Sequence, residues 1–237
     1  MPVHPDLTAL KWRPILRKDV CSVKHRPGGL NAYDLQVILT KLQTCVAWQQ
    51  QYESFKKFAF YIREGCSCWF GRGHTGIKGE PYPEWMQEIM TTVMPVCDIH
   101  DSDEHPTACY IQHFRGRDQS QDWYNMGYGI CGGSQMCGRT ISLSMGVPRN
   151  FLVRHPWYKF GGAVLTQQMH EGDLLVTDGT FHQNHYVKIP PFDDLGAGSH
   201  YLITWAWITH HADYCELATS AQAPDEGLDE AAPADPG

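Results

Sequence analysis

The second half of the chain is a succession of short β-type segments, and this pattern constrains the fold more than any other feature. Stretches rich in β-branched and aromatic residues alternate with turns that contain Gly, Pro, Asp and Asn. Short strands at this spacing are typical of a β-sandwich or jelly roll. The pattern predicts strands at 108–114, 140–145, 151–154, 163–167, 173–177, 185–189 and 201–208.

Two helical segments precede these strands. Apolar residues recur at helical spacing after Asn31, a favourable helix cap, and predict a helix over 32–51. Pro83 predicts the start of a second helix over 84–94, and a short strand is expected at 58–62. Helices followed by a run of strands indicate an α+β fold, with a jelly-roll core and N-terminal helices packed on it.

The two ends of the chain differ in composition from its body. Residues 1–30 are rich in Pro, Gly and basic side chains, and we expect an irregular N-terminal arm. Residues 31–215 then form one domain. Residues 216–237 are rich in Ala, Pro and acidic side chains, which predicts a disordered tail. The arm and the tail are candidate contact elements for a partner.

Neither a membrane span nor a signal peptide is evident, since no apolar run approaches the length that either requires. This predicts a soluble, intracellular protein in a reducing compartment, the cytosol or nucleus, with an organelle as the alternative. The nine cysteines are then expected to be reduced thiols. A zinc site is a weaker alternative, because Cys66 and Cys68 form only a C-x-C pair and no C-x-x-C pair exists. A substitute metal site at Cys131 and Cys137 has equally little support from spacing.

Several short motifs occur in an order that resembles one known family. They are Trp-Phe-Gly at 69–71 with Pro-Tyr-Pro-Glu-Trp at 81–85, Ser-Met-Gly at 144–146 with Arg149, Phe151, Arg154 and His155, Gly-Asp-Leu-Leu-Val at 172–176, and Thr204-Trp205. Together they resemble the AlkB-like 2-oxoglutarate/Fe(II) dioxygenases over roughly residues 55–210. The resemblance implies a double-stranded β-helix, which is a jelly roll that surrounds a metal site.

The resemblance also implies where the iron ligands belong. The family holds iron with a His-x-Asp pair and a distal His, which leaves positions open for 2-oxoglutarate and dioxygen. The His-x-Asp pair falls on Trp123 and Asn125. An indole cannot ligate iron, and a neutral amide is a poor substitute for a carboxylate. Moving the register by one residue gives Tyr124 and Met126, which are no better.

The distal ligand position is ambiguous. An ungapped match places Val187 there, whereas a shift of two residues, which keeps the same face of a strand, brings in His185. His182 lies close by in the sequence. The literal His-x-Asp pairs, His4 with Asp6 and His211 with Asp213, lie where this fold does not place its metal pair. We attribute them to chance and expect His211 at an exposed strand end.

The positions that would bind 2-oxoglutarate are also altered. Phe114 replaces the family's tyrosine, and Thr204 matches the family's threonine. The two arginine positions fall on His200 and Ala206, and neither supplies the permanent, bidentate cation that a carboxylate requires. The region of Trp69, Phe70 and Gly71 matches the substrate lid. Its aromatic side chains are expected either to grip a ligand or to cap the core.

Loss of these groups together favours a catalytically degenerate protein that binds no cofactor and acts as a binding or scaffold subunit for a protein partner or larger assembly. One alternative is an active Fe(II)/2-oxoglutarate dioxygenase with rearranged ligands, such as His185 and a second histidine, that demethylates or hydroxylates nucleic acid or protein. Nucleic acid is weakly supported as a partner, because the body of the chain is not basic. Another alternative is an unrelated cupin-like or lectin-like sandwich that binds a small molecule.

Overall fold

The computed structural model of the chain describes residues 11–18, 21–50, 57–70, 77–116, 119–125, 137–155, 162–191, 198–209, 211 and 215–217. The helices are α1 (Ala32–Thr44), α2 (Glu84–Val96), the 3-10 turn η3 (Ser102–Glu104) and the short α4 (Phe181–Asn184). The strands are β1 (Arg13–Lys18), β2 (Cys21–Arg26), β3 (Gln49–Gln50), β4 (Lys57–Ile62), β5 (Trp69–Phe70), β6 (Ile77–Lys78), β7 (Glu80–Pro81), β8 (Ala108–Arg115), β9 (Gln121–Tyr124), β10 (Cys137–Gly146), β11 (Arg149–Arg154), β12 (Leu165–Met169), β13 (Leu174–Gly179), β14 (Tyr186–Ile189) and β15 (Ser199–Ile208).

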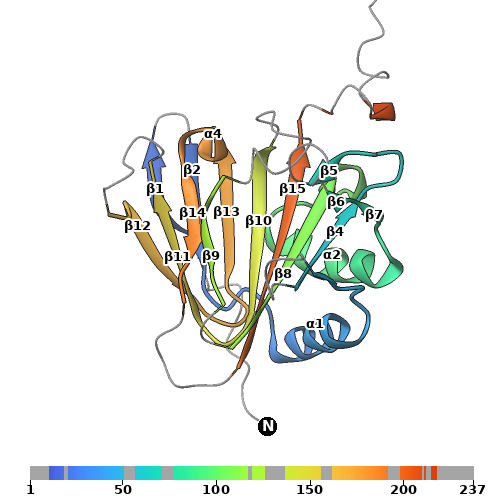
Figure 1. Cartoon of the computed structure of the whole chain (residues 1–237), viewed down its shortest axis with the longest axis horizontal. Coiled ribbons are helices and arrows are strands. Elements are labelled where there is room, and N and C mark those ends of the chain that lie inside the picture. The colour runs from blue at the N-terminus through green and yellow to red at the C-terminus, as the bar shows by residue number, and fades with distance from the viewer. Residues whose placement is uncertain are drawn as a thin grey trace, which may run out of the picture.

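Two sheets form the body of the molecule (Figure 1). The large sheet has the order β1-β2-β13-β10-β15-β8-β4-β3, with β7 added beside β4. The small sheet has the order β12-β11-β14-β9, and a separate two-stranded sheet joins β5 to β6. Except for the parallel pair of β4 and β7, the strand pairs in these sheets are antiparallel. The sheets place strands from distant parts of the sequence around one interior.

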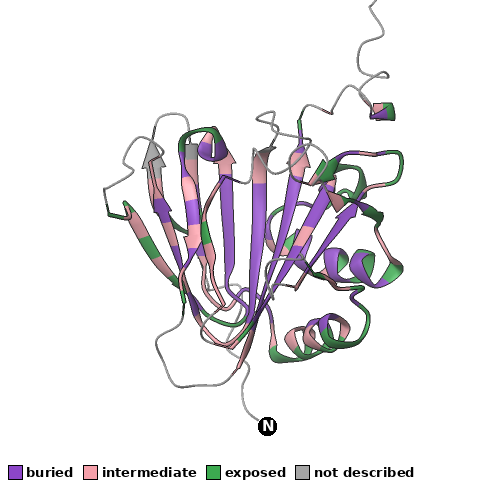
Figure 2. Cartoon of the chain, viewed as in Figure 1, coloured by how far each residue is buried: buried purple, intermediate pink, exposed green. Residues whose placement is uncertain are grey.

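The large sheet separates two packed layers. Its outer face is covered by α1 and α2, and its inner face packs against the small sheet. The central strand β15 is buried on both faces (Figure 2). Its outward residues, Tyr201, Ile203 and Trp205, join the helices in the principal core. Its inward residues are therefore the ones that line the interior of the sandwich.

The predicted elements agree well with the structure. Helix α1 begins at the predicted residue, where the Asn31 side chain accepts a hydrogen bond from the backbone N–H of Asp34 at 2.9 Å. It ends at Thr44 rather than near residue 51, and the N–H of Cys45 closes its last turn on the carbonyl of Lys41. Helix α2 begins at Glu84, directly after Pro83, as predicted. Each strand predicted from residue 58 onward is present, with its bounds shifted by a few residues.

The prediction of an irregular arm over residues 1–30 is wrong for the described part. β1 and β2 pair with one another, and β2 pairs with β13 inside the large sheet. Burial alternates along β2, with Val23 and His25 inside and Lys24 exposed, so the segment carries a strand pattern. Pro14 is tolerated because it lies on the edge strand next to an irregularity in the pairing. Residues 1–10, and 218–237 of the predicted acidic tail, lie outside the described residues.

None of the described helices combines the length and the apolar character that crossing a membrane would require.

Candidate functional site

A small cavity lies in the interior of the sandwich, where the family resemblance places a metal. Among the described residues that line it, it has a volume of about 10 Å³. A space of this size holds roughly one water molecule. It is lined by Tyr124, Thr140, Ser142, Phe151, Thr177, His182, Val187, Leu202 and Thr204.

One wall of this cavity is a closed network of hydrogen bonds. Nε2 of His182 lies 3.2 Å from Oγ1 of Thr140 and 2.9 Å from Oγ1 of Thr177. The two threonine hydroxyls are 2.6 Å apart. On the neighbouring strand pair, Oγ of Ser142 lies 3.0 Å from Oγ1 of Thr204. These polar groups bond to each other across β10, β13 and β15 and hold the sheet together from inside.

His182 is the imidazole that lines the cavity. It is 4% exposed, and burial, followed by the proximity of His185, lowers its pKa to about 3. Its Nδ1 has no hydrogen-bond partner among the described residues. At neutral pH this side chain is therefore an uncharged ring that shares hydrogen bonds with two hydroxyls.

The residues at the predicted His-x-Asp positions do not converge on the cavity. Trp123 is on the opposite face of β9 from Tyr124, which lines the cavity. The indole of Trp123 is covered by the guanidinium of Arg154 at 4.4 Å and the ammonium of Lys188 at 5.9 Å. These cation–π contacts lie on the outer side of the small sheet. Of the two registers considered, the one through Tyr124 faces inward, and Met126 lies outside the described residues.

Asn125 is buried but serves as a hydrogen-bond donor to the backbone. Its Nδ2 donates to the carbonyl of His182 and, at 3.1 Å, to the carbonyl of His185. These contacts fix the turn of α4 against the end of β9. A carboxylate at this position would meet the same two carbonyl oxygens, so the site is built for an amide.

Of the two alternatives for the distal ligand, Val187 lines the cavity. His185 is 1% exposed and follows α4 directly. Its Nδ1 donates to the carbonyl of Phe181 at 3.1 Å, and its ring stacks on that of Phe181 with 4.9 Å between centroids. The ring of His155 lies 4.7 Å from it. His185 is thus held in a cluster of rings next to the cavity.

The predicted co-substrate positions share one inner surface of the large sheet, but they are occupied by contacts within the protein. Phe114 and His200 are each 1% exposed, with their ring centroids 5.7 Å apart. Nδ1 of His200 donates to the carbonyl of Val147 at 2.9 Å. Burial lowers the pKa of His200 to about 4, so the ring is neutral where the family resemblance requires a cation. Thr204 bonds to Ser142, and Ala206 packs in an apolar cluster with Phe60.

Arg149 is a buried cation at the same end of the sandwich, but its guanidinium is already used. It is 1% exposed, and its Nη atoms donate to the carbonyls of Gln119 at 3.2 Å, Pro190 at 3.4 Å and Gly116. The guanidinium also lies over the ring of Phe114. Arg149 therefore joins two loops by three backbone oxygens, the loop between β8 and β9 and the segment after β14, instead of pairing with a dicarboxylate.

The lid residues divide between the core and the surface. The ring of Phe70 stacks on Tyr110, with 4.2 Å between centroids and 13° between planes, and caps the inner core. Trp69 is 38% exposed. Gly71 lies outside the described residues. The alternative that the lid aromatics cap the sandwich holds for Phe70.

These residues do not fit an iron ion with 2-oxoglutarate. An octahedral iron site requires two imidazoles and a carboxylate on one side and room for a five-carbon diacid on the other. The described side chains that line the cavity include one imidazole and no carboxylate. The volume is also far below that of an ordinary ligand site, which is roughly 300–1,000 Å³.

Comparison with known proteins supports the architecture. The chain is matched by no family model and by no curated protein. The structure of OsALKBH1 superposes on it with a TM-score of 0.51 and 11% identity, over 83% of this chain and 100% of that chain. A 2OG-Fe(II) oxygenase family oxidoreductase from Burkholderia pseudomallei reaches a TM-score of 0.49 at 11% identity, over 80% of this chain and 85% of its own.

The chain has the AlkB-like double-stranded β-helix fold. At this level of identity the likeness concerns the architecture, and it confirms the fold predicted from the motif order. The AlkB resemblance, as against a cupin-like or lectin-like sandwich, required residues 173–177 and 201–208 to line one shared cavity. Thr177 of β13 and Thr204 of β15 line the same cavity.

Sequence reasoning placed His182 only as a neighbour and missed Thr140, Ser142 and Thr177. A signal for them was present, because each lies on a predicted strand where polar residues alternate with buried aliphatic ones. A polar residue at every second position of a central strand is either exposed or directed at an interior site. The strand prediction by itself does not distinguish the two.

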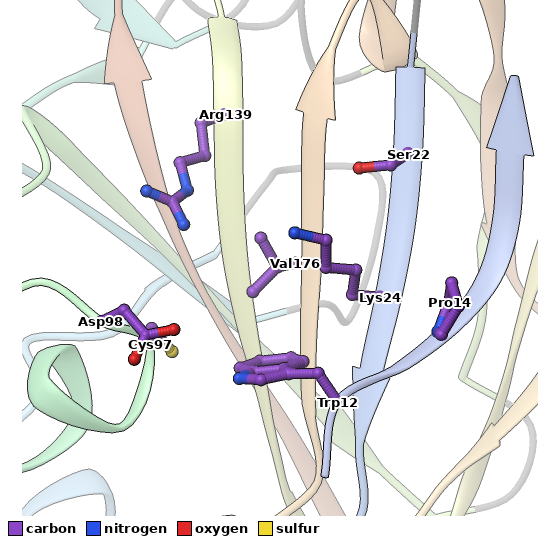
Figure 3. A pocket seen from close by; sticks show the side chains of 8 residues that line it. All are labelled: Trp12, Pro14, Ser22, Lys24, Cys97, Asp98, Arg139 and Val176. Carbon is purple, nitrogen blue, oxygen red and sulfur yellow. The ribbon is translucent and has the colours of Figure 1, made fainter. Parts of the chain in front are cut away.

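A much larger hollow lies on the outer face of the AlkB-like domain, beyond the end of α2 (Figure 3). Its volume is about 540 Å³, and it is lined by Trp12, Pro14, Ser22, Lys24, Cys97, Asp98, Arg139 and Val176. Figure 3 shows Val176 in the middle of the hollow, with Arg139 and Asp98 on one side of it, Lys24 on the other and Trp12 below. This is the range of volumes in which small molecules or partner side chains are bound.

Proposed function

We propose that this chain is a non-catalytic protein of AlkB-like fold that serves as a binding or scaffold subunit. The observation that carries the proposal is that the interior cavity bounded by described residues has a volume of only about 10 Å³ and that its polar lining residues bond to one another. A catalytic site needs open coordination positions and room for its co-substrate. Here the fold is kept while its interior has become a core.

The hydrogen-bond partners of the altered positions support this proposal. Asn125 and His200 each donate to backbone carbonyls, and so does Arg149, which is not an altered position but a residue of the matching hairpin motif. A polar group that has been recruited in this way stabilises the fold, and removing it leaves buried acceptors without donors. The side chains at the altered positions therefore lack the chemistry of ligands and also have structural hydrogen-bond partners of their own.

The alternative function is an active Fe(II)/2-oxoglutarate dioxygenase with rearranged ligands. The observation in its favour is that three imidazoles, those of His182, His185 and His155, lie close together at one end of the cavity. Metal binding through Nε2 of His182 would require it to leave both threonine hydroxyls, whereas its Nδ1 has no hydrogen-bond partner among the described residues. The same experiment tests both functions.

The test is binding of Mn(II), a redox-inert stand-in for Fe(II), and 2-oxoglutarate by isothermal calorimetry and thermal shift. We expect no 2-oxoglutarate binding at millimolar concentration, no dependence of either ligand on the other, and no succinate production with Fe(II) and ascorbate. Binding of 2-oxoglutarate that requires Mn(II), and that is lost in His182→Ala, would overturn the proposal in favour of the alternative.

The partner surface that we propose is the outer hollow. It combines an aromatic ring, Trp12, with the exposed basic side chain of Lys24. Arg139 and Asp98 also line it, and Arg139 is paired with Asp178 at 3.3 Å. Tryptophan is among the residue types that contribute most to protein interfaces. A protein segment with acidic and apolar residues fits this lining.

This surface is tested by native purification of the tagged chain from its source cells, followed by measurement of complex size. Lys24→Glu should release the chain to monomer size. Lys78→Glu, an exposed lysine on β6 outside the hollow, is the matched control and should leave the complex intact. A wild-type chain that is monomeric in this experiment would contradict the scaffold role.

A further inference from the structure

Four metal-binding side chains meet outside the sandwich interior, at the lid end of the molecule. They are Cys66 and Cys68 from the loop after β4, and His211 and Cys215 from the chain that follows β15. Their three sulfurs and one imidazole nitrogen all lie within 4.8 Å of one another. Residues more than 140 positions apart in the sequence are thus joined at one point.

The distances have the pattern of a tetrahedron. Nδ1 of His211 lies 3.6 Å from Sγ of Cys66, 3.5 Å from Sγ of Cys68 and 3.4 Å from Sγ of Cys215. Sγ of Cys66 and Sγ of Cys215 are 3.9 Å apart. For tetrahedral zinc, with bonds of about 2.3 Å to sulfur and about 2.0 Å to nitrogen, the ligand-to-ligand edges are about 3.8 Å for S–S and about 3.5 Å for S–N.

Local backbone structure presents these side chains to the same point. Gly65 has a φ of 80°, which closes a tight turn, and the N–H of Cys66 bonds back to the carbonyl of Arg63 at 3.0 Å. Ser67, between the two loop cysteines, directs its N–H at Sγ of Cys215 at 3.4 Å. A backbone N–H that points at a cysteine sulfur stabilises the thiolate form, which is the form that binds metal.

Burial closes the cluster to solvent on most sides. Cys66, Cys68 and Cys215 are 7%, 0% and 1% exposed, and they belong to an apolar cluster with Phe60 and Ile208. His211 is half-buried. The sequence predicts His211 at an exposed strand end, and this prediction is wrong because the ring turns toward the three sulfurs.

We propose that Cys66, Cys68, His211 and Cys215 form a structural zinc site. Three thiolates and one imidazole complete a tetrahedral zinc ion, which leaves no position open for a substrate. On binding, the cysteines release their thiol protons to solvent. Soft sulfur donors favour zinc over magnesium, calcium or manganese, which prefer oxygen ligands.

The site would fasten the end of the chain to the base of the lid. Cys68 directly precedes β5, which carries Trp69 and Phe70, and His211 and Cys215 follow β15. β5 and the end of β15 lie at the same edge of the molecule (Figure 1). Zinc would therefore fix the position of Phe70 over the core, whether or not the sandwich interior is catalytic.

The first experiment uses the untagged wild-type chain, prepared without chelators and analysed by elemental mass spectrometry. We expect about one zinc per chain, which is released when a mercurial reagent modifies the thiols of the chain. Replacement by Co(II) should give thiolate-to-metal charge-transfer absorption and the intense visible bands of tetrahedral cobalt. These readouts need no variant. Zinc below a tenth of an equivalent together with no cobalt spectrum would overturn the proposal.

Variants assign the ligands. Cys215→Ser and His211→Ala should lose zinc, whereas His211→Cys supplies a fourth sulfur and should retain it. Cys97→Ser is the matched control, since Cys97 is a buried cysteine, 2% exposed, that lies outside the cluster. Full zinc content in Cys215→Ser, or a Cys66–Cys215 disulfide in the wild-type chain, would contradict the site. Loss of zinc in Cys97→Ser to the same degree would also do so.

Discussion

The amide of Asn125 donates a hydrogen bond to the backbone carbonyl of His185 at 3.1 Å, and both residues occupy positions that the family resemblance assigns to metal ligands. Asn125 thus contributes its side chain to this contact, and His185 contributes only its main-chain carbonyl. The second donor hydrogen of the same amide reaches the carbonyl of His182. These two positions therefore contact each other directly, through a side-chain amide and a main-chain carbonyl.

Asn125→Asp should destabilise the protein and should not create a metal site. The new carboxylate would be buried against two carbonyl oxygens that had been accepting hydrogen bonds, which costs about 2–4 kcal/mol. Chemical denaturation at pH 7 measures the loss, and Mn(II) calorimetry measures binding. Asn150→Asp on the half-buried surface of β11 is the control and should change stability by less than about 0.5 kcal/mol. A gain of Mn(II) affinity in Asn125→Asp would contradict this assignment.

Arg149→Met should reduce the free energy of unfolding by about 2–4 kcal/mol. The variant keeps the apolar stem but leaves the carbonyls of Gln119, Pro190 and Gly116 without their donor. Urea denaturation measures the change. Arg63→Met is a suitable comparison, since Arg63 is 42% exposed and pairs with Asp103 at 3.9 Å, and its effect should stay below about 1 kcal/mol. Equal effects of the two substitutions would contradict the structural role of Arg149.

Stability should fall as the pH is lowered from 7 toward 4. Burial lowers the pKa of His182 to about 3 and the pKa values of His113 and His200 to about 4, each from an ordinary value of 6.5. Between these limits the unfolded chain binds protons that the folded chain does not, so stability is complete above pH 6.5 and is lost below it. Each histidine should account for about 1 kcal/mol between pH 7 and 5.5.

The measurement is the urea midpoint at a series of pH values. His182→Gln, which removes one of these groups, should reduce the loss of stability between pH 7 and 5.5 by about 1 kcal/mol whatever its effect on absolute stability. A loss identical to that of the wild type would show that His182 is already protonated, or exposed, in the folded chain.

The strand pattern predicted most of the fold because its signals are local. Alternation along 140–145 and 201–208, together with the turn residues between segments, defined strands that the structure contains. The arm was predicted poorly, since Pro14 and the glycines near β2 obscured a short alternation whose burial depends on pairing with β13. Such burial is a property of the assembled sheet and leaves little trace in a single segment.

The candidate site was less predictable for a related reason. Motif order located Phe114, His200 and Thr204 on the inner surface, where the structure places them. It could not show that Trp123 faces outward under Arg154, because a shift of one residue reverses every side chain of a strand. The cysteine cluster was also missed, because its C-x-C pair and its distant Cys215 become a set only after β4 and β15 enter the same sheet.

Asp173→Asn should lower the free energy of unfolding by about 2–3 kcal/mol. Such a loss would show that the aspartate of the Gly-Asp-Leu-Leu-Val motif has a structural role. Asp173 is 3% exposed, and both of its carboxylate oxygens have partners. Its Oδ2 lies 3.0 Å from Nε2 of His25 and accepts a hydrogen bond from the N–H of His170 at 2.9 Å. Its Oδ1 accepts a hydrogen bond from the N–H of Gly28 at 2.9 Å. In the variant, the amide nitrogen of asparagine would replace one of the two oxygens. Its two donor hydrogens would then face N–H groups that need an acceptor, so at least one hydrogen bond would be lost.

The protonation state of Asp173 defines the conditions for that experiment. Burial raises its pKa, but the hydrogen bonds from His25, His170 and Gly28 outweigh burial and leave the pKa below 3.8. Its contribution is therefore present above pH 3.8 and is lost as the pH falls through the lowered folded value, so the comparison belongs at pH 7. Asp178→Asn is the matched control, because Asp178 is 34% exposed in a surface pair with Arg139 and should lose less than about 1 kcal/mol. If both substitutions cost the same, the carboxylate of Asp173 does not anchor β2 to the turn before β13.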